Sequence, residues 1–166
     1  MLSKIRQSKA KGFTIIEVLI VLAIAGLILL VVFLAVPALQ RNARNSTRER
    51  DVASVLGAVS EFTNANNGAL PTTAAVAADG TLTISSTTAG TNSITTKLGY
   101  FKAGTGVSIT VATAPASATN STTVDSIVVY TGAECNSLGT QAVAGQSRSF
   151  AATYTLETNS KLCKAS

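Results

Sequence analysis

Residues 12–36 read GFTIIEVLIVLAIAGLILLVVFLAV, and the rest of the chain is arranged around this stretch. Of the 24 residues at positions 13–36, Glu17 is the only one that carries a charge. At ~1.5 Å per residue a helix of this length is ~36 Å long, enough to cross the ~30 Å hydrocarbon layer of a membrane. The sequence therefore predicts a membrane-crossing helix here.

The twelve residues before this helix, MLSKIRQSKAKG, contain four Lys or Arg residues and no acidic residue. Because cations ahead of a first span stay in the cytoplasm, we expect a single-pass protein with a cytoplasmic N terminus and its bulk outside. These cations supply most of the formal charge of +5, which is therefore a topology signal. Nucleic acid is accordingly not expected as a direct ligand.

Glu17 lies inside the apolar run, where a carboxylate costs roughly 2.5–3.5 kcal/mol at the bilayer centre and less near the edge. Intramembrane acids normally have a partner charge. The sequence KGFTIIE at residues 11–17, followed by the long apolar helix, resembles the processing site of a type IV prepilin, in the type IVa-like form with a Gly-Phe junction.

The resemblance implies that a prepilin peptidase in the inner membrane cuts after Gly12 and that the new amine of Phe13 is N-methylated. Copies of the chain would then assemble, with membrane assembly machinery, into an extracellular filament used in adhesion, motility or DNA uptake. Gly12 would let the backbone lie extended in the protease cleft. Glu17 of one copy would pair with the Phe13 amine of another, offsetting two desolvation costs.

Other interpretations remain open beside a pilus subunit. A pseudopilin of type II secretion or competence shares this N terminus, although major secretion pseudopilins carry a calcium site and no dense run of Asp and Asn ligands is present here. A signal peptide has a shorter apolar core of 7–15 residues. A monomeric single-pass surface protein fits the length and the charges but leaves Glu17 unexplained.

Two residues of the long helix are expected to be soft points. Gly26 interrupts a run of strong membrane formers, and Pro37 removes a backbone donor and can kink or end the first helical section. In type IV pilins a Gly and a following Pro bracket a segment that unwinds in the filament, so the resemblance assigns this role to Gly26 and Pro37.

Residues 38–67 are predicted to form an amphipathic helix half, which would give one helix over about 14–66 if it continues through Pro37. Asn66-Asn67-Gly68 reads as its stop signal. The apolar residues recur at helical spacing, whereas Arg48, Asp51 and other charges are placed largely off this stripe. The members of the stripe are Val52, Val55, Leu56, Val59 and Phe62.

Four arginines just beyond the predicted span form a basic patch, which we expect to be solvated or to face lipid headgroups. An intersubunit salt bridge is the alternative role. The four are Arg41, Arg44, Arg48 and Arg50.

Residues 68–166 switch to period-two alternation and predict a globular β-sheet head. We expect an antiparallel sheet of about four strands, with one apolar face covering the helical stripe. The Thr- and Ala-rich segments 72–96 and 112–125 are expected to be mainly surface loops. The strand candidates lie at 81–84, 95–101, 107–111, 127–130 and 150–156.

The fold class is thus α+β, with a leader at 1–12, a transmembrane and polymerisation helix at 13–37, a helix half at 38–67 and a head at 68–166. Cys135 and Cys163 form the only cysteine pair, and an outer, oxidising compartment favours a disulfide between them. The chain contains no His. We therefore expect no catalytic residue, no metal site, no cofactor and no enzymatic activity.

Overall fold

The computed structural model describes residues 12–87, 90–102, 108–113 and 125–166. The chain forms two compact units, Met1–Gln40 and Arg41–Ser166, which we describe separately. Helix α1 (Ile15–Ala65) has 51 residues, beginning in the first unit and ending in the second. The prediction of one helix over about 14–66 is therefore confirmed. Gly26 and Pro37 both lie inside it, so the first helical section does not end at Pro37.

The C terminus of α1 is closed by the predicted stop signal. Asn67 and Gly68 have φ values of 55° and 86°, which is the left-handed region favoured by Asn and Gly after a helix. The Gly68 N–H donates to the Thr63 carbonyl at 2.8 Å, and the side chain of Asn66 donates to the Phe62 carbonyl at 2.8 Å. These bonds satisfy carbonyls that the end of a helix leaves without partners.

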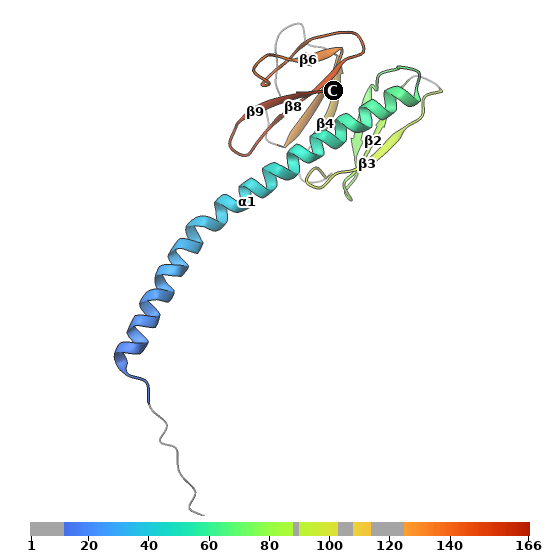
Figure 1. Ribbon diagram of the computed structural model, residues 1–166. Helices are drawn as coiled ribbons and strands as arrows, with labels where there is room; N and C mark the ends of the chain where they lie inside the picture. The colour runs from blue at the N-terminus through green and yellow to red at the C-terminus, as the bar shows by residue number, and fades with distance from the viewer. Residues whose placement is uncertain (1–11, 88–89, 103–107, 114–124) are drawn as a thin grey trace, which may run out of the picture. The chain divides into compact units, whose positions relative to one another are not determined.

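Nine strands follow in the described part of the second unit and form three sheets (Figure 1). The first sheet has the order β1-β2-β3, the second β4-β5-β8-β9, and the third is the pair β6-β7. The strands are β1 Thr73–Val76, β2 Thr81–Ser85, β3 Ile94–Lys97, β4 Ser108–Thr113, β5 Ser126–Thr131, β6 Ala133–Cys135, β7 Ala142–Ala144, β8 Phe150–Thr155 and β9 Lys161–Ala165.

The α+β layout is confirmed and the head contains a four-stranded sheet, but the prediction that one wholly antiparallel sheet makes up the head is wrong in two respects. The head has three sheets, and β4 pairs with β5 in parallel, with Ile109 opposite Ile127. A parallel pair requires a crossover of about a dozen residues, and the interval between β4 and β5 has that length. β5 is a central strand of its sheet, lying between β4 and β8.

The prediction that residues 72–96 are mainly surface loop is also wrong. This segment contains β1, β2 and most of β3, although β2 and part of β3 fall on short strand candidates. Only Leu82 and Ile84 of these three strands are fully buried, and most of the other positions hold Thr or Ala. The alternation of apolar and polar residues that predicts a strand is therefore weak. Of the other predicted loop, residues 114–124 lie outside the described residues, as does Val107.

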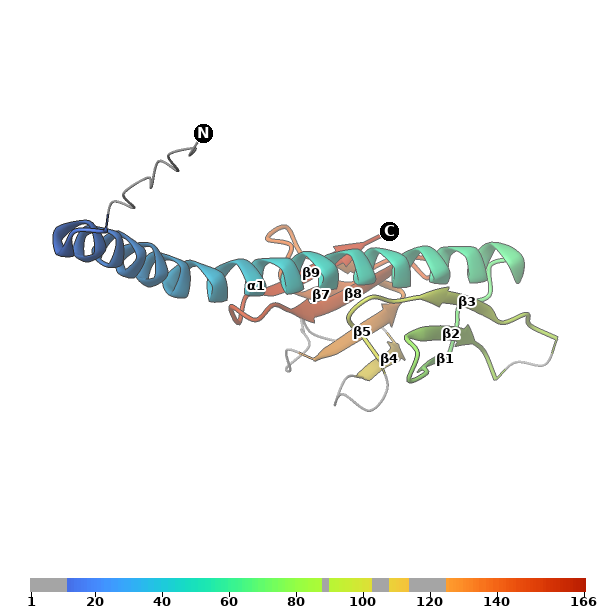
Figure 2. The ribbon, with the colours of Figure 1, turned by 90° about the horizontal axis from the view of Figure 1, so that it is seen from below.

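The core of the second unit lies between the C-terminal half of α1 and the two larger sheets (Figure 2). All five members of the predicted helical stripe are buried there, which confirms its packing on the sheet. Both sheets contribute apolar side chains to one core beneath the helix. The helix therefore joins two sheets whose strands do not pair with each other. The strand residues include Leu82 and Ile84 from the first sheet and Ile109, Ile127, Val129, Ala152 and Tyr154 from the second.

The predicted disulfide is present and joins β6 to β9. The Cys135 and Cys163 Cα atoms are 5.6 Å apart, and the two residues are 28 positions apart in the sequence. Beside it, three fully buried alanines pack the β6-β7 pair against β8: Ala133, Ala142 and Ala151. Closing a loop of this length stabilises a fold by roughly 3–4 kcal/mol, so the bridge secures the chain end where the local core consists of small side chains.

Candidate functional site

The N-terminal half of α1 exposes a long apolar surface in its own unit. Phe13 is 88% exposed and Phe33 is 74% exposed, and the large aliphatic side chains between them are exposed as well. Within the described residues, α1 is the one helix long and apolar enough to cross a membrane. A surface of this size needs lipid or another apolar molecule to cover it.

Residues 12–14 precede the helix and carry the predicted processing site. Gly12 is exposed, and a Cβ added to it would meet no atom within 4 Å. The peptide bond between Gly12 and Phe13 therefore lies in non-helical backbone, and the space at the Cβ position of Gly12 is open. Residues 1–11 of the predicted leader lie outside the described residues.

Glu17 makes a reciprocal cap with Thr14 at the start of α1. The Glu17 carboxylate accepts hydrogen bonds from the Thr14 backbone N–H at 2.9 Å and from the Thr14 hydroxyl at 2.7 Å. In return the Glu17 N–H donates to Thr14 Oγ1 at 3.4 Å. This is the capping-box arrangement, in which two unpaired donors of a helix start are satisfied together. The sequence interpretation missed Thr14, although its spacing to Glu17 just before an apolar run was the signal.

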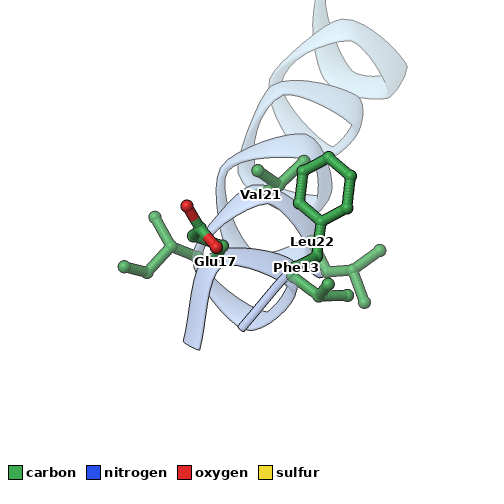
Figure 3. Close-up of a pocket in the computed structure, with 6 residues that line it drawn as sticks. Phe13, Glu17, Val21 and Leu22 are labelled. Carbon is green, nitrogen blue, oxygen red and sulfur yellow. The ribbon is translucent and has the colours of Figure 1, made fainter. Parts of the chain in front are cut away.

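The surroundings of Glu17 are otherwise apolar. An open groove along the first turns of α1 is lined by Glu17 and five apolar residues, of which Phe13, Val21 and Leu22 are labelled in Figure 3. The carboxylate supplies the only oxygen atoms among the side chains drawn there. An amine brought to this groove by another molecule would find the Glu17 carboxylate as an acceptor in an otherwise apolar lining.

Residues 7–33 match the model of the prokaryotic N-terminal methylation motif. The match covers the Gly12–Phe13 junction, Glu17 and Gly26, and it indicates a precursor of the type IV pilin-like or pseudopilin kind. No curated protein and no solved structure matches the chain. The match covers residues 7–33 and does not extend to the head.

The predicted basic patch divides into two kinds of residue: Arg41 and Arg50 are exposed, as expected of solvated charge, whereas Arg44 and Arg48 make ion pairs within the chain. Arg44 makes a two-bond ion pair with Glu157, at 2.5 and 2.8 Å, between α1 and the turn after β8. Its hydrogen bonds lower the pKa of Glu157 below the ordinary value, and the same contact raises the pKa of Arg44. The Glu157 N–H also donates to Asn45 Oδ1 at 3.0 Å, so this turn is attached to two successive helical residues.

Arg48 is only 1% exposed, which shows that the expectation of solvated charge is wrong for this residue. Its Nη2 donates to Asp125 at 3.1 Å and to the Tyr100 hydroxyl, and the guanidinium carbon lies 4.2 Å from the centre of the Tyr100 ring. Glu157 approaches the same nitrogen at 3.6 Å. The signal for burial was the helical spacing, since Arg48 lies four residues before Val52 on the stripe.

Asp51 is likewise buried, where the sequence interpretation placed it off the stripe. Its carboxylate accepts three backbone hydrogen bonds, from Gly99 at 2.8 Å, Tyr100 at 2.7 Å and Phe101 at 3.1 Å. A carboxylate bound in this way anchors the segment after β3 to the helix and offsets its own desolvation. Asp51 thus positions the Tyr100 ring beside Arg48.

The described residues contain no group of three or more His, Cys, Asp or Glu side chains that could hold a metal ion. The chain's lack of a cofactor and of enzymatic activity stays a prediction. The ion pairs of Arg44 and Arg48 and the backbone hydrogen bonds to Asp51 connect α1 to the rest of the head.

Proposed function

We propose that this chain is the precursor of a structural subunit of a type IV pilus. A prepilin peptidase cuts between Gly12 and Phe13, and the new Phe13 amine is methylated. Before assembly the subunit crosses the inner membrane once with its N terminus in the cytoplasm; afterwards it belongs to an extracellular filament. The observation that supports this best is the fully exposed apolar half of α1, which bears the methylation motif and a single carboxylate.

Assembly exchanges lipid for neighbouring copies around the apolar half of α1. In the single subunit the Glu17 carboxylate is hydrogen-bonded by Thr14, which lowers the cost of holding it near the membrane edge. The processed Phe13 amine of another copy offers it a full opposite charge. Since a misplaced neighbour leaves both charges unpaired, the pair also selects the register of the subunits.

A pseudopilin of a secretion or DNA-uptake system is the second candidate, and the same methylation motif supports it. The two functions are separated by deleting the gene and imaging the cells. Loss of long surface filaments supports the pilus, whereas intact pili with a defect in secretion or DNA uptake support the pseudopilin. In both cases we propose copies of the chain, the peptidase and the membrane assembly machinery as partners, with no enzymatic activity and no cofactor.

The intact mass of the protein recovered from sheared surface filaments tests the proposal. We expect a chain that lacks residues 1–12, begins with N-methylated Phe13 and retains one disulfide. Cells without the peptidase serve as the control and should hold the full precursor in the membrane. A surface protein that keeps its first twelve residues and stays monomeric would overturn the proposed function.

A further inference from the structure

The residues that close the C terminus of α1 include the one Asn-Gly sequence of the chain, Asn67-Gly68. In such a sequence the Gly nitrogen can attack the side-chain amide of the Asn, because glycine has no Cβ to hinder the approach. A succinimide ring then forms as ammonia leaves, and water opens the ring to give aspartate or isoaspartate. Asn67 is exposed, so the water that this reaction consumes is present at the site.

The folded head holds this pair in a geometry that opposes ring closure. The Gly68 N–H has to lose its proton before the nitrogen can attack, and it donates to the Thr63 carbonyl at 2.8 Å. Asn67 lies in the left-handed region, with a φ of 55°, and the cap keeps the Gly68 N–H directed back at the helix. Ring closure therefore requires the last turn of α1 to open first.

Asn66 is the residue that opposes this opening most directly. Its side chain donates to the Phe62 carbonyl at 2.8 Å and to the Asn92 carbonyl at 3.1 Å, and it accepts from the Asn92 N–H at 2.7 Å. These three bonds attach the end of α1 to the segment before β3. Loss of the Asn66 side chain would therefore free the turn that contains Asn67 and Gly68.

A cation lies beside the reacting pair. A Cβ built on Gly68 would lie 2.9 Å from Arg148 Cζ, so the guanidinium is directly against the Gly68 backbone. Arg148 takes part in none of the ion pairs found among the described residues. Once the turn is open, a positive charge here favours the deprotonated Gly68 nitrogen and the oxyanion of the ring-closing step. The same charge offers a partner to a carboxylate at position 67.

We propose that Asn67 is a self-modification site, converted to aspartate or isoaspartate by ring closure onto the Gly68 nitrogen at a rate set by opening of the helix end. The new carboxylate pairs with Arg148. The product weakens the cap, because a carboxylate is unfavourable beside the partial negative charge of a helix C terminus and isoaspartate lengthens the backbone of the turn. The stability of the head therefore falls with the age of the subunit, and this requires the head alone, whatever the chain assembles into.

Mass spectrometry of peptides from the purified full-length chain, kept at neutral pH in detergent with and without urea, tests the gating. We expect conversion at Asn67 to be at least ~10-fold slower in the folded chain than in urea, because the helix end must open first. Asn159-Ser160 is the internal control, since Asn159 has a similar φ of 59° but no glycine after it, and it should convert more slowly than Asn67 in urea. Equal rates at Asn67 with and without urea, or no conversion in urea, would overturn the proposal.

Asn66→Ala opens the helix end without changing the reacting pair. We expect it to raise the conversion rate of the folded chain at least ~3-fold and to leave the rate in urea unchanged. Asn64→Ala, at an exposed helical position, is the matched control and should change neither rate. A folded Asn66→Ala chain that converts at the wild-type rate would show that the helix end does not control the reaction.

The product contact is tested by combining Asn67→Asp with Arg148→Gln. We expect Asn67→Asp to lower the urea midpoint of the head, and to lower it further when Arg148 is replaced, because the carboxylate then has no partner. Equal shifts in the two backgrounds would overturn the pairing with Arg148. These measurements are made on single subunits, so their outcome is independent of whether the chain forms filaments.

Discussion

At the scale of single residues, Glu17 has two partners available at different stages. Thr14 of its own chain caps it in the single subunit, and the Phe13 amine of a neighbour would replace or supplement that cap in a filament. The cap is neutral and the amine is charged, so only the second partner depends on the charge of the carboxylate. The two contributions can therefore be separated by substitution.

Glu17→Gln keeps the capping arrangement, because Gln serves at this position of a capping box, but it removes the charge. We expect the variant to accumulate in the membrane and to lose filament yield at least ~10-fold, since a buried amine left unpaired costs about 3–5 kcal/mol. We expect the same loss for Glu17→Ala. Electron microscopy and the amount of sheared filament measure the effect. Normal filaments from Glu17→Gln would show that the cap, and not the charge, is what assembly needs.

Asp51 acts at the same scale inside the head. Asp51→Ala leaves three backbone N–H groups without an acceptor, and we expect it to lower the free energy of unfolding by on the order of 3 kcal/mol. Urea unfolding of the full-length subunit in detergent, followed by tyrosine fluorescence, measures this. Glu49→Ala, an exposed acid two positions away, is the control and should stay within ~0.5 kcal/mol of wild type. Equal effects of the two variants would contradict the anchoring role.

At the scale of elements, α1 is one continuous helix whose faces have different neighbours. In Arg41–Ser166 one face of the helix packs on two sheets, and the opposite face, which includes Ala53, Gly57 and Glu61, is exposed. The helix contains Gly57 on this exposed face, and Gly68 follows its C-terminal end with a positive φ. Substituting each glycine by alanine therefore tests helix propensity at the first position and helix termination at the second. Whether Gly26 and Pro37 loosen the helix in a filament stays a prediction.

Gly57→Ala should raise the free energy of unfolding of the head by ~0.5–1 kcal/mol, because Ala is the better helix former and its Cβ meets nothing. Gly68→Ala should do the opposite and lower it by ~1 kcal/mol or more. At Gly68 the backbone has φ +86°, a conformation that is strained for any residue with a Cβ, and the end of the flexible Arg148 side chain would have to move away from the added atom. Urea midpoints measured under one set of detergent conditions compare the two, and a shift of the same sign for both would contradict this account.

At the scale of the whole molecule, contacts between distant segments hold the head on its helix. Glu157 connects the turn between β8 and β9 to Arg44 and Asn45, and Asp51 connects the segment after β3. The disulfide adds a covalent connection from β6 to β9. The two larger sheets share no backbone ladder, so these contacts and the common core decide their arrangement within the head.

The Glu157 contact makes stability depend on pH. Hydrogen bonds from Arg44 lower the pKa of Glu157 in the folded head below the ordinary value of 4.5. A lowered folded pKa means that the stabilisation is fully present above the unfolded pKa and is lost as pH falls through the folded one. We expect urea midpoints to fall below about pH 4.5 and Glu157→Gln to reduce this fall while lowering stability at neutral pH. Identical pH profiles of the variant and the wild type would contradict this assignment.

The sequence by itself determined the apolar helix, the processing motif, the buried stripe, the helical stop and the pairing of the only two cysteines. These features depend on local spacing or on residue type, which are visible without knowledge of distant contacts. Only the tertiary structure decided which groups stabilise the buried Arg48 and Asp51, that the head has three sheets and that β4 runs parallel to β5. The hydrogen-bond partners of Arg48 and Asp51 lie 48 to 77 residues away in the chain, and no local pattern records them.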